Sequence, residues 1–384
     1  MATLLITFTV FGIGFIAAGF IDGYNVALNE PYDYTINATY EHPMTESRIE
    51  EIAEESNAVI TSIKHIDCLL LGVQNNYKNG ERDWGSRIVV SEDNFNVLSG
   101  AAISVPKGSY TVYYDSSMEY KLNAFSAESS LFYNPTTEQE FYFIQNEPIC
   151  YDGLFNTRSI FSSFLILNND DYRTIAATLA DEYRAVSYMV NVENWQDTMD
   201  FQNNILKAVI SDNNGVIFTN WHNSATFEKT GSQAEYLPFD GNETKIARLW
   251  SLYPLSKLSS TTTQFEAFAT YLMLMLFIAI VAFVSAVMVI GLKLISTIWD
   301  DAEVYNDLRR LGMKRKKIKE LITKQMLFVY FIPTVLGCII GAFTTYRIML
   351  VSGVIYIGET MQLVGCVCGL VLIIQIAIFF VLRS

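Results

Sequence analysis

The chain has 384 residues, of which 51% are hydrophobic, 14% aromatic and only 17% charged. Soluble domains carry about 25% charged residues, so this composition excludes a wholly soluble protein, and 21 Gly, 8 Pro and 5 Cys fit neither a disordered chain nor a small disulfide scaffold. The formal net charge of −14 argues against a nucleic-acid-binding protein, which needs a basic surface to neutralise phosphates.

Four apolar segments are long enough to cross a membrane, for which a helix needs about 20 residues. They are Thr3–Phe20, Phe268–Leu292 with an apolar continuation to Trp299, Met326–Phe343 with Pro333 inside it, and Met361–Leu382. The segments between them are polar, and the first of these is long enough for an independent domain.

The first apolar segment, Thr3–Phe20, could instead be a secretory signal peptide. A signal peptide has a charged region before its apolar core and a small-residue cleavage site after it. The charged region is missing here, and Ala17-Ala18-Gly19 is a poor match to a cleavage site. The sequence therefore favours a retained membrane helix.

The charges of the chain are separated along the sequence. Residues 21–264 hold 33 of the 40 acidic and 15 of the 26 basic residues. Eight basic residues cluster with the single acid Glu320 in a later segment, namely Arg309, Arg310, Lys314, Arg315, Lys316, Lys317, Lys319 and Lys324. By the positive-inside rule, this basic segment lies in the cytoplasm. The acidic domain then lies outside the plasma membrane, and both termini are cytoplasmic.

The expected fold is a membrane protein with four transmembrane α-helices and a large α+β extracytoplasmic domain between the first and second helices. The expected boundaries are 1–21 for the first helix, 22–265 for the outer domain, 266–299 for the second helix, 300–325 for a cytoplasmic loop, 326–346 for the third helix, 347–360 for a short outer loop and 361–384 for the fourth helix.

Within the outer domain, the residue patterns predict both helices and strands. A capping box at Ser47–Glu50 predicts a helix to about Ile60. Asn169-Asp170-Asp171 can cap a helix from Tyr172 to about Tyr183. A strand over Ala185–Val192, a helix over Trp195–Ile210 and a turn at Asn213-Asn214-Gly215 follow. Val-, Ile-, Tyr- and Phe-rich runs predict further strands at Ser86–Val90, Tyr110–Tyr114, Glu140–Ile144 and Ile160–Leu167.

No catalytic or metal-binding constellation stands out in the sequence. His42, His65 and His222 are too scattered to indicate a metal site. Cys68 and Cys150 could form a disulfide in an oxidising compartment or remain as two buried thiols. The acidic outer surface could attract cationic peptides, or it could serve only to keep the domain soluble.

The cytoplasmic loop carries the most informative pattern. Val304, Leu308 and Leu311 are spaced as on one face of a helix, and so are Ile318, Leu321 and Ile322. Gly312 lies between the two sets, where a helix would end. The pattern predicts a helix, a glycine break, a short basic turn and a helix entering the third span. Such a loop could lie on the anionic inner leaflet through its lysines. It could also dock into a groove of a cytoplasmic partner through its apolar side chains.

The segment from Tyr305 to Ile318 resembles the corresponding loop of FtsX/MacB-type ABC transporter permeases. That family has a leucine-basic-any-leucine-glycine stretch, here Leu308–Gly312, followed by a polar turn and an aliphatic residue. Its topology of one helix, a large outer domain and three helices also agrees. Tyr305 and the run from Lys324 to Pro333 look closest to the Bce-type branch, which detoxifies antimicrobial peptides. The fragments Asn169–Tyr172 and Asn194–Thr198 also resemble that branch.

Two departures from the family pattern bear on the length of the chain. Family members usually begin with a basic amphipathic helix, which this sequence lacks. Bce-type permeases are also longer, so this sequence would match only their C-terminal portion. The resemblance therefore implies either a four-helix member with a clipped start or a half-length permease that needs a companion permease subunit.

The resemblance implies a division of labour between two kinds of subunit. This chain has no phosphate-binding loop of the GxxxxGK[ST] type, so it cannot hydrolyse ATP and is not expected to bind a cofactor or a metal. A dimer of a separate cytoplasmic ATPase, with ATP and Mg, would dock on Tyr305, Leu308, Arg309, Arg310, Leu311, Gly312, Met313 and Lys314. ATP-driven movement would then pass to the outer domain, a process called mechanotransmission.

The membrane helices contain two glycine motifs of the kind that lets helices pack closely. These are Gly337 with Gly341 and Gly365 with Gly369. Such motifs also occur by chance in apolar segments. Besides the ATPase, the expected partners of the chain are a second permease copy or a companion permease subunit, and the lipid bilayer.

Three functions fit the sequence to different degrees. The first is an ABC permease in the export or detoxification of antimicrobial peptides or lipid-linked ligands. The alternative is an FtsX-like regulator of a cell-wall enzyme or another surface protein. A sensor receptor is disfavoured, because three spans follow the outer domain and no signalling module follows the spans.

Overall fold

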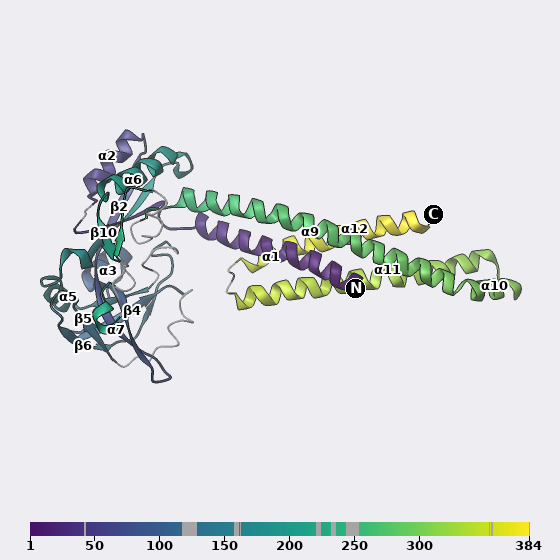
Figure 1. Ribbon diagram of the computed structural model, residues 1–384, viewed down its shortest axis with the longest axis horizontal. Helices are drawn as coiled ribbons and strands as arrows, with labels where there is room; N and C mark the ends of the chain where they lie inside the picture. Colours follow the sequence, from purple (N-terminus) through teal and green to yellow (C-terminus); the bar gives the residue numbers. More distant parts are fainter. Residues whose placement is uncertain are drawn as a thin grey trace. The chain divides into compact units, whose positions relative to one another are not determined.

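The computed structural model describes residues 1–41, 44–116, 129–156, 161, 163–219, 224–231, 236–242, 253–352, 354 and 356–383. The chain divides into two compact units (Figure 1). The helical unit comprises Met1–Val26 and Thr261–Ser384, and the β-rich unit comprises Ala27–Ser260.

Four long helices dominate the helical unit. They are α1 (Ala2–Leu28), α9 (Lys257–Asp300), α11 (Arg315–Val351) and α12 (Ile357–Arg383). Each is long and apolar enough to cross a membrane, which confirms the prediction of four such helices. With 44 residues at about 1.5 Å each, α9 is about 66 Å long, roughly twice the thickness of a bilayer's hydrocarbon core. The short helix α10 (Ala302–Arg310) lies between α9 and α11 in the sequence.

Helix α1 contacts the other three long helices of its unit. The Thr9 hydroxyl lies 3.4 Å from the Ala279 carbonyl oxygen of α9, and the rings of Phe20 and Phe268 stack at 4.0 Å. A Cβ added at Gly14 would lie 2.8 Å from Val364 of α12 and 3.1 Å from Thr345 of α11. Small residues on α1 therefore allow the helices to approach one another closely.

The β-rich unit is built on a ten-stranded sheet with the order β12-β1-β9-β2-β3-β8-β4-β6-β5, with β7 paired to β4. Its strands are β1 (Tyr34–Thr39), β2 (Ile60–Asn76), β3 (Arg82–Ser91), β4 (Ser109–Tyr114), β5 (Ser129–Tyr133), β6 (Glu140–Gln145), β7 (Ile149–Cys150), β8 (Ser163–Leu167), β9 (Arg184–Val192) and β12 (Leu255–Ser256). Strands β10 (Ile217–Thr219) and β11 (Tyr236–Pro238) form a separate pair. The helices are α2 (Glu46–Glu55), α3 (Glu92–Ser99), α5 (Asn169–Ala176), α6 (Met199–Asp212) and α7 (Phe227–Thr230), with 3₁₀ turns η3 (Asp181–Tyr183) and η4 (Trp195–Asp197).

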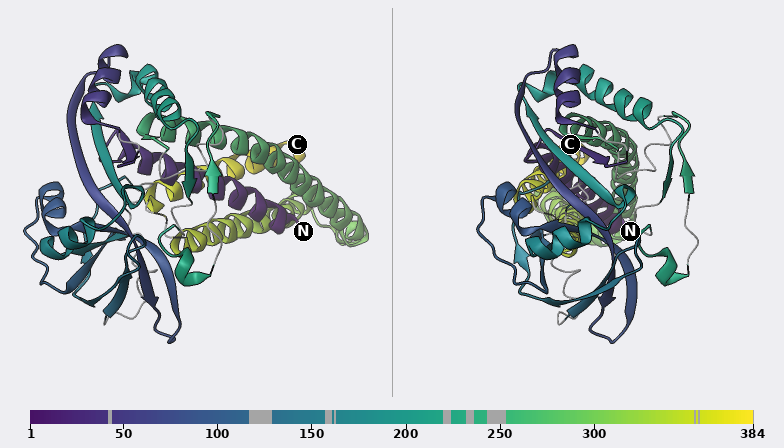
Figure 2. Two further views of the ribbon diagram at one scale, coloured as in Figure 1. Left: turned by 60° about the vertical axis from the view of Figure 1, so that its left-hand side comes forward. Right: turned by 90° about the vertical axis from the view of Figure 1, so that its left-hand side faces the viewer.

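The 17-residue strand β2 connects two parts of this sheet (Figure 2). Its first half pairs with β9, and its second half pairs with β3. At Gly72 and Val73 it also pairs with β5, so β2, β3, β8, β4, β6 and β5 form a closed ring. A Cβ at Gly72 would lie 2.8 Å from the Ala225 carbonyl oxygen, so a glycine is needed where these backbones approach.

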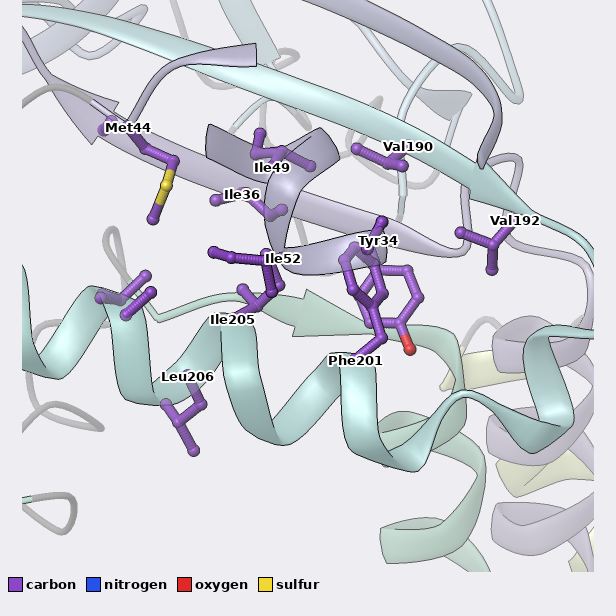
Figure 3. Packing of buried hydrophobic residues seen from close by; sticks show 14 of the residues in the cluster. Tyr34, Ile36, Met44, Ile49, Ile52, Val190, Val192, Phe201, Ile205 and Leu206 are labelled. Atoms are coloured by element: carbon purple, nitrogen blue, oxygen red, sulfur yellow. The ribbon is translucent and has the colours of Figure 1, made fainter. Parts of the chain in front are cut away.

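Helices α2 and α6 cover the part of the sheet that contains β1 and β9 (Figure 3). The Tyr34 and Phe201 rings meet edge to face at 4.9 Å, and Ile49 and Ile205 are fully buried beside them. In the ring of strands, Val89 packs into one apolar cluster, whereas Ile88 and Val90 pack into another on the opposite face. Both faces of β3 are therefore buried, which explains its continuous apolar run.

Several predicted boundaries in the β-rich unit are wrong. Helix α2 is capped by Thr45, whose Oγ1 accepts the Arg48 N–H at 3.2 Å, and not by Ser47. It ends at Glu55, and Asn57, with a φ of +55°, turns the chain before β2 begins at Ile60. Helix α5 ends at Ala176, before the predicted Tyr183. The predicted strand over Ile160–Leu167 begins at Ser163, with Ile160 outside the described residues.

The two cysteines of the β-rich unit match neither of the predicted alternatives. Cys68 is buried and Cys150 is exposed, and neither of them forms a disulfide. Burial raises the pKa of the Cys68 thiol, so this side chain serves as an inert packing group. His42 and His222 lie outside the described residues, and His65 is on β2.

Candidate functional site

The segment between α10 and α11 forms a tight elbow, defined here as residues 301–325. Helix α10 ends at Arg310, Gly312 has a φ of +90°, and α11 begins at Arg315. The Met313 N–H donates to the Leu308 carbonyl at 3.0 Å, and the Gly312 N–H donates to the Arg309 carbonyl at 3.1 Å. These two hydrogen bonds are a Schellman motif, which stops a helix at a residue of positive φ.

A hydrogen-bonded chain of three side chains ties the two helices of the elbow together. The Tyr305 hydroxyl donates to Oε1 of Gln325, and Nε2 of Gln325 donates to Oδ2 of Asp301 at 2.6 Å. Burial and the neighbouring Asp301 carboxylate raise the pKa of Tyr305, so its hydroxyl keeps the donated proton. Tyr305 therefore positions α10 against α11. The sequence resemblance singles out Tyr305 and a run that includes Gln325, but it predicts neither the hydrogen bond between them nor the role of Asp301.

The predicted docking residues differ in how far they are exposed. Leu311 is 84% exposed, and Arg309, Arg310 and Lys314 are exposed as well. Tyr305, Leu308 and Met313 are half-buried. The elbow thus presents Leu311 next to these cations, together with the less exposed apolar side chains of Val304 (55%) and Leu321 (44%). Leu308 and Met313 occupy the two positions whose side chains commonly pack together in a Schellman motif.

The exposed side chains of the elbow suit binding to another surface. An exposed leucine flanked by arginines and lysines suits a groove with an apolar floor and acidic rim. Among the described residues, no group of three or more His, Cys, Asp or Glu side chains could hold a metal ion.

The two glycine motifs of the membrane helices have different surroundings. A Cβ at Gly337 would lie 2.8 Å from Ile6, and one at Gly341 would lie 2.9 Å from Val10, both on α1. The Thr7 hydroxyl also donates to the Gly337 carbonyl at 3.3 Å. A Cβ at Gly365 or Gly369 would meet no described atom within 4 Å. Gly337 and Gly341 therefore allow α1 and α11 to pack, whereas Gly365 and Gly369 have no such contact within the described part of this chain.

The two ends of the β-rich unit are tied to each other. Strands β1 and β12 pair through Tyr34 and Ser256. In the sequence, β1 is the first strand after α1, and β12 directly precedes α9. Nζ of Lys257 lies 3.7 Å from Oδ1 of Asp33 and 5.1 Å from the centre of the Trp195 ring. The other oxygen, Oδ2 of Asp33, accepts the Val192 N–H at 3.0 Å. We refer to Asp33, Lys257 and Trp195 as the junction. Asp33 and Lys257 carry opposite charges and lie near the two ends of the domain between α1 and α9. This pair of charges is the sequence signal that could have identified the junction.

Comparison of the sequence with protein-family models and with curated proteins finds no match.

Replacing Gly312 with alanine is expected to loosen α10, because a positive φ costs a residue with a Cβ about 1–2 kcal/mol. Hydrogen exchange of the α10 amides should then become about 5–30-fold faster. The matched control is Gly291→Ala in α9, where an added Cβ meets nothing within 4 Å. Equal exchange rates in the Gly312→Ala and wild-type proteins would contradict the assigned helix stop.

Proposed function

We propose that this chain is the permease subunit of an ABC transporter of the FtsX/MacB type. In this proposal a separate cytoplasmic ATPase dimer hydrolyses ATP and docks on the elbow. Movement of the membrane helices then reaches the β-rich unit outside the plasma membrane. The transporter exports or detoxifies antimicrobial peptides or lipid-linked ligands, and this chain catalyses no reaction itself.

The observation that carries the proposal is the exposed Leu311 at a rigid, basic elbow. A leucine that is 84% exposed contributes little to the stability of its own chain. The Schellman motif and the Tyr305–Gln325 hydrogen bond hold this side chain on a defined backbone, as a docking surface requires. An ordinary cytoplasmic loop needs the positive charges but needs neither the fixed turn nor the exposed leucine.

The junction supports the mechanical part of the proposal. Because β1 pairs with β12, the backbone that follows α1 and the backbone that precedes α9 are hydrogen-bonded neighbours. A displacement of either helix along its axis would therefore act on the same edge of the sheet. In the proposed orientation, the elbow and both termini face the cytoplasm, as the positive-inside rule requires for eight clustered bases.

The decisive experiment is purification of the tagged chain from its native membrane, with mass spectrometry of what accompanies it. We expect an ABC ATPase to accompany the wild-type chain and to be lost with Leu311→Asp. The melting temperature should stay unchanged, because the replaced side chain is exposed. The matched control is Val97→Asp on α3, where the replaced side chain is 85% exposed but belongs to the β-rich unit.

Two other outcomes would redirect the assignment. A wall enzyme in place of an ATPase would favour the FtsX-like regulator. An ATPase retained equally by Leu311→Asp and Val97→Asp would mean that the elbow is not its docking site. A second permease chain in the wild-type sample would identify the companion subunit.

A further inference from the structure

The β-rich unit has a pocket that the elbow and the junction do not involve. Its volume is about 360 Å³, and its lining includes Tyr40, Met44, Glu46, His65, Asp67 and Tyr188. We refer to it as the tyrosine–carboxylate pocket. At this size, near the lower end of the roughly 300–1,000 Å³ typical of ligand pockets, it admits one side chain and not a folded peptide.

The register of the sheet brings the pocket residues together. On paired strands β2 and β9, His65 lies opposite Tyr188 and Asp67 lies opposite Val186. Successive residues of a strand face opposite sides, so Ile66 and Cys68, between and beside them, pack into the buried cluster behind the sheet. Glu46, the first residue of α2, also lines the pocket.

Two carboxylates act on the same tyrosine in this pocket. Burial, the Asp67 carboxylate and the Glu46 carboxylate raise the pKa of Tyr188, in that order of size. The Tyr40 hydroxyl donates to Oδ1 of Asp67 at 2.6 Å, and burial with this hydrogen bond raises the pKa of Tyr40. The hydroxyl groups of Tyr40 and Tyr188 therefore stay protonated beside the carboxylates of Asp67 and Glu46.

None of the described residues that line the pocket is a lysine or an arginine, and its one basic side chain, His65, lies 6.1 Å from the Tyr188 ring, centroid to centroid. Across the described residues, neither Glu46 nor Asp67 forms an ion pair with a lysine or arginine. Arg184 is close to the pocket, but its guanidinium lies 4.3 Å above the Tyr40 ring and its Nη1 lies 3.3 Å from Oδ1 of Asp181. Negative charge next to aromatic rings without a paired cation is a binding environment for an external one.

We infer that the tyrosine–carboxylate pocket binds one guanidinium or ammonium group from a side chain of a peptide. The carboxylates of Glu46 and Asp67 accept its charge-assisted hydrogen bonds, and Tyr188 offers its ring face to the cation. This inference builds on the proposed function by specifying what kind of peptide the outer domain takes. It also assigns the attraction for a cation to one site rather than to the acidic domain as a whole.

The test uses the full chain in a neutral detergent and two fluorescent, capped pentapeptides. One contains two arginines, and the other has citrulline, a neutral residue of the same shape, in their place. We expect the arginine peptide to bind at least about tenfold more tightly, since one charge-assisted hydrogen bond is worth roughly 1.5–3 kcal/mol. Glu46→Gln and Asp67→Asn should each weaken it by a similar factor. Asparagine keeps an oxygen for the Tyr40 hydroxyl, so the fold should survive.

The matched control is Glu54→Gln, which removes the same charge from an exposed position two turns further along α2. If this variant weakens binding as much as Glu46→Gln, the attraction is to the acidic domain as a whole and the pocket assignment is wrong. Equal binding of the two peptides would overturn it as well. Co-purification of the ATPase does not depend on the pocket, so either result leaves the proposed permease role standing.

Discussion

Replacement of Lys257 by methionine is expected to destabilise the β-rich unit by about 3 kcal/mol. The side chains of Lys257 and Asp33 are only 13% and 10% exposed, so removing the cation leaves a carboxylate that water reaches poorly. Removal of one partner from a buried ion pair costs roughly 3–5 kcal/mol, and the 3.7 Å separation places this pair at the lower end. For a unit of this size, the melting temperature should fall by about 6–12 °C. Trp195 lies against Lys257, so intrinsic fluorescence can follow the transition.

Two further variants distinguish the loss of the ion pair from the loss of a single charge. The double variant Asp33→Asn with Lys257→Met should recover most of the loss, because no unpaired charge remains and asparagine can still accept the Val192 N–H. Lys207→Met removes the same charge from an exposed position on α6 and should change stability by less than about 0.5 kcal/mol. A double variant as unstable as Lys257→Met alone would show that packing against Trp195, and not the ion pair, holds the junction.

The four membrane helices could be predicted from composition, because a hydrocarbon environment demands long apolar runs. Their full lengths could not. Helix α9 begins at Lys257, although Thr261, Thr262 and Thr263 interrupt the apolar pattern. Directly after them, the Phe265 ring contacts the Phe20 ring of α1 at 6.3 Å, and such packing can sustain a helix through a polar stretch.

The topology of the β-rich unit was harder to predict than its elements. The sequence predicts five of its strands near their true positions, namely β3, β4, β6, β8 and β9, but not the longest strand, β2. Its first half is polar and its second half apolar, because the two halves pair with different strands in different surroundings. Such a change of environment within one strand obscures the period of two on which strand prediction relies.

The elbow was the part of the candidate site best indicated by sequence. Apolar spacing and Gly312 predicted its helix, stop and second helix, and the structure has α10, a positive φ and α11 in that order. The hydrogen bonds that fix it could not be inferred, because Asp301 and Gln325 are 24 residues apart and neither belongs to the repeating pattern. The tyrosine–carboxylate pocket likewise depends on the β2–β9 register, which is a long-range property.

Replacement of Gly337 by leucine should disrupt the packing of α1 on α11. An added Cβ would lie 2.8 Å from Cβ and Cγ2 of Ile6 and 3.0 Å from the Thr3 carbonyl oxygen. A branched side chain and a helix backbone cannot move aside as a flexible chain end could, so the two helices must separate. Overpacking costs about 1–3 kcal/mol, and the larger value is expected here because α1 also contacts α9 and α12. The purified protein should melt at a lower temperature, with Gly337→Ala showing a smaller shift.

Gly369→Leu provides the matched comparison, because it makes the same change in another membrane helix at a position with no described atom within 4 Å of an added Cβ. If lipid surrounds this face of α12, the leucine at position 369 contacts acyl chains and the melting temperature stays unchanged. A loss equal to that of Gly337→Leu would instead mean that the Gly365–Gly369 face packs against another chain. The two glycine motifs, indistinguishable in the sequence, therefore report separately on packing within the chain and packing between chains.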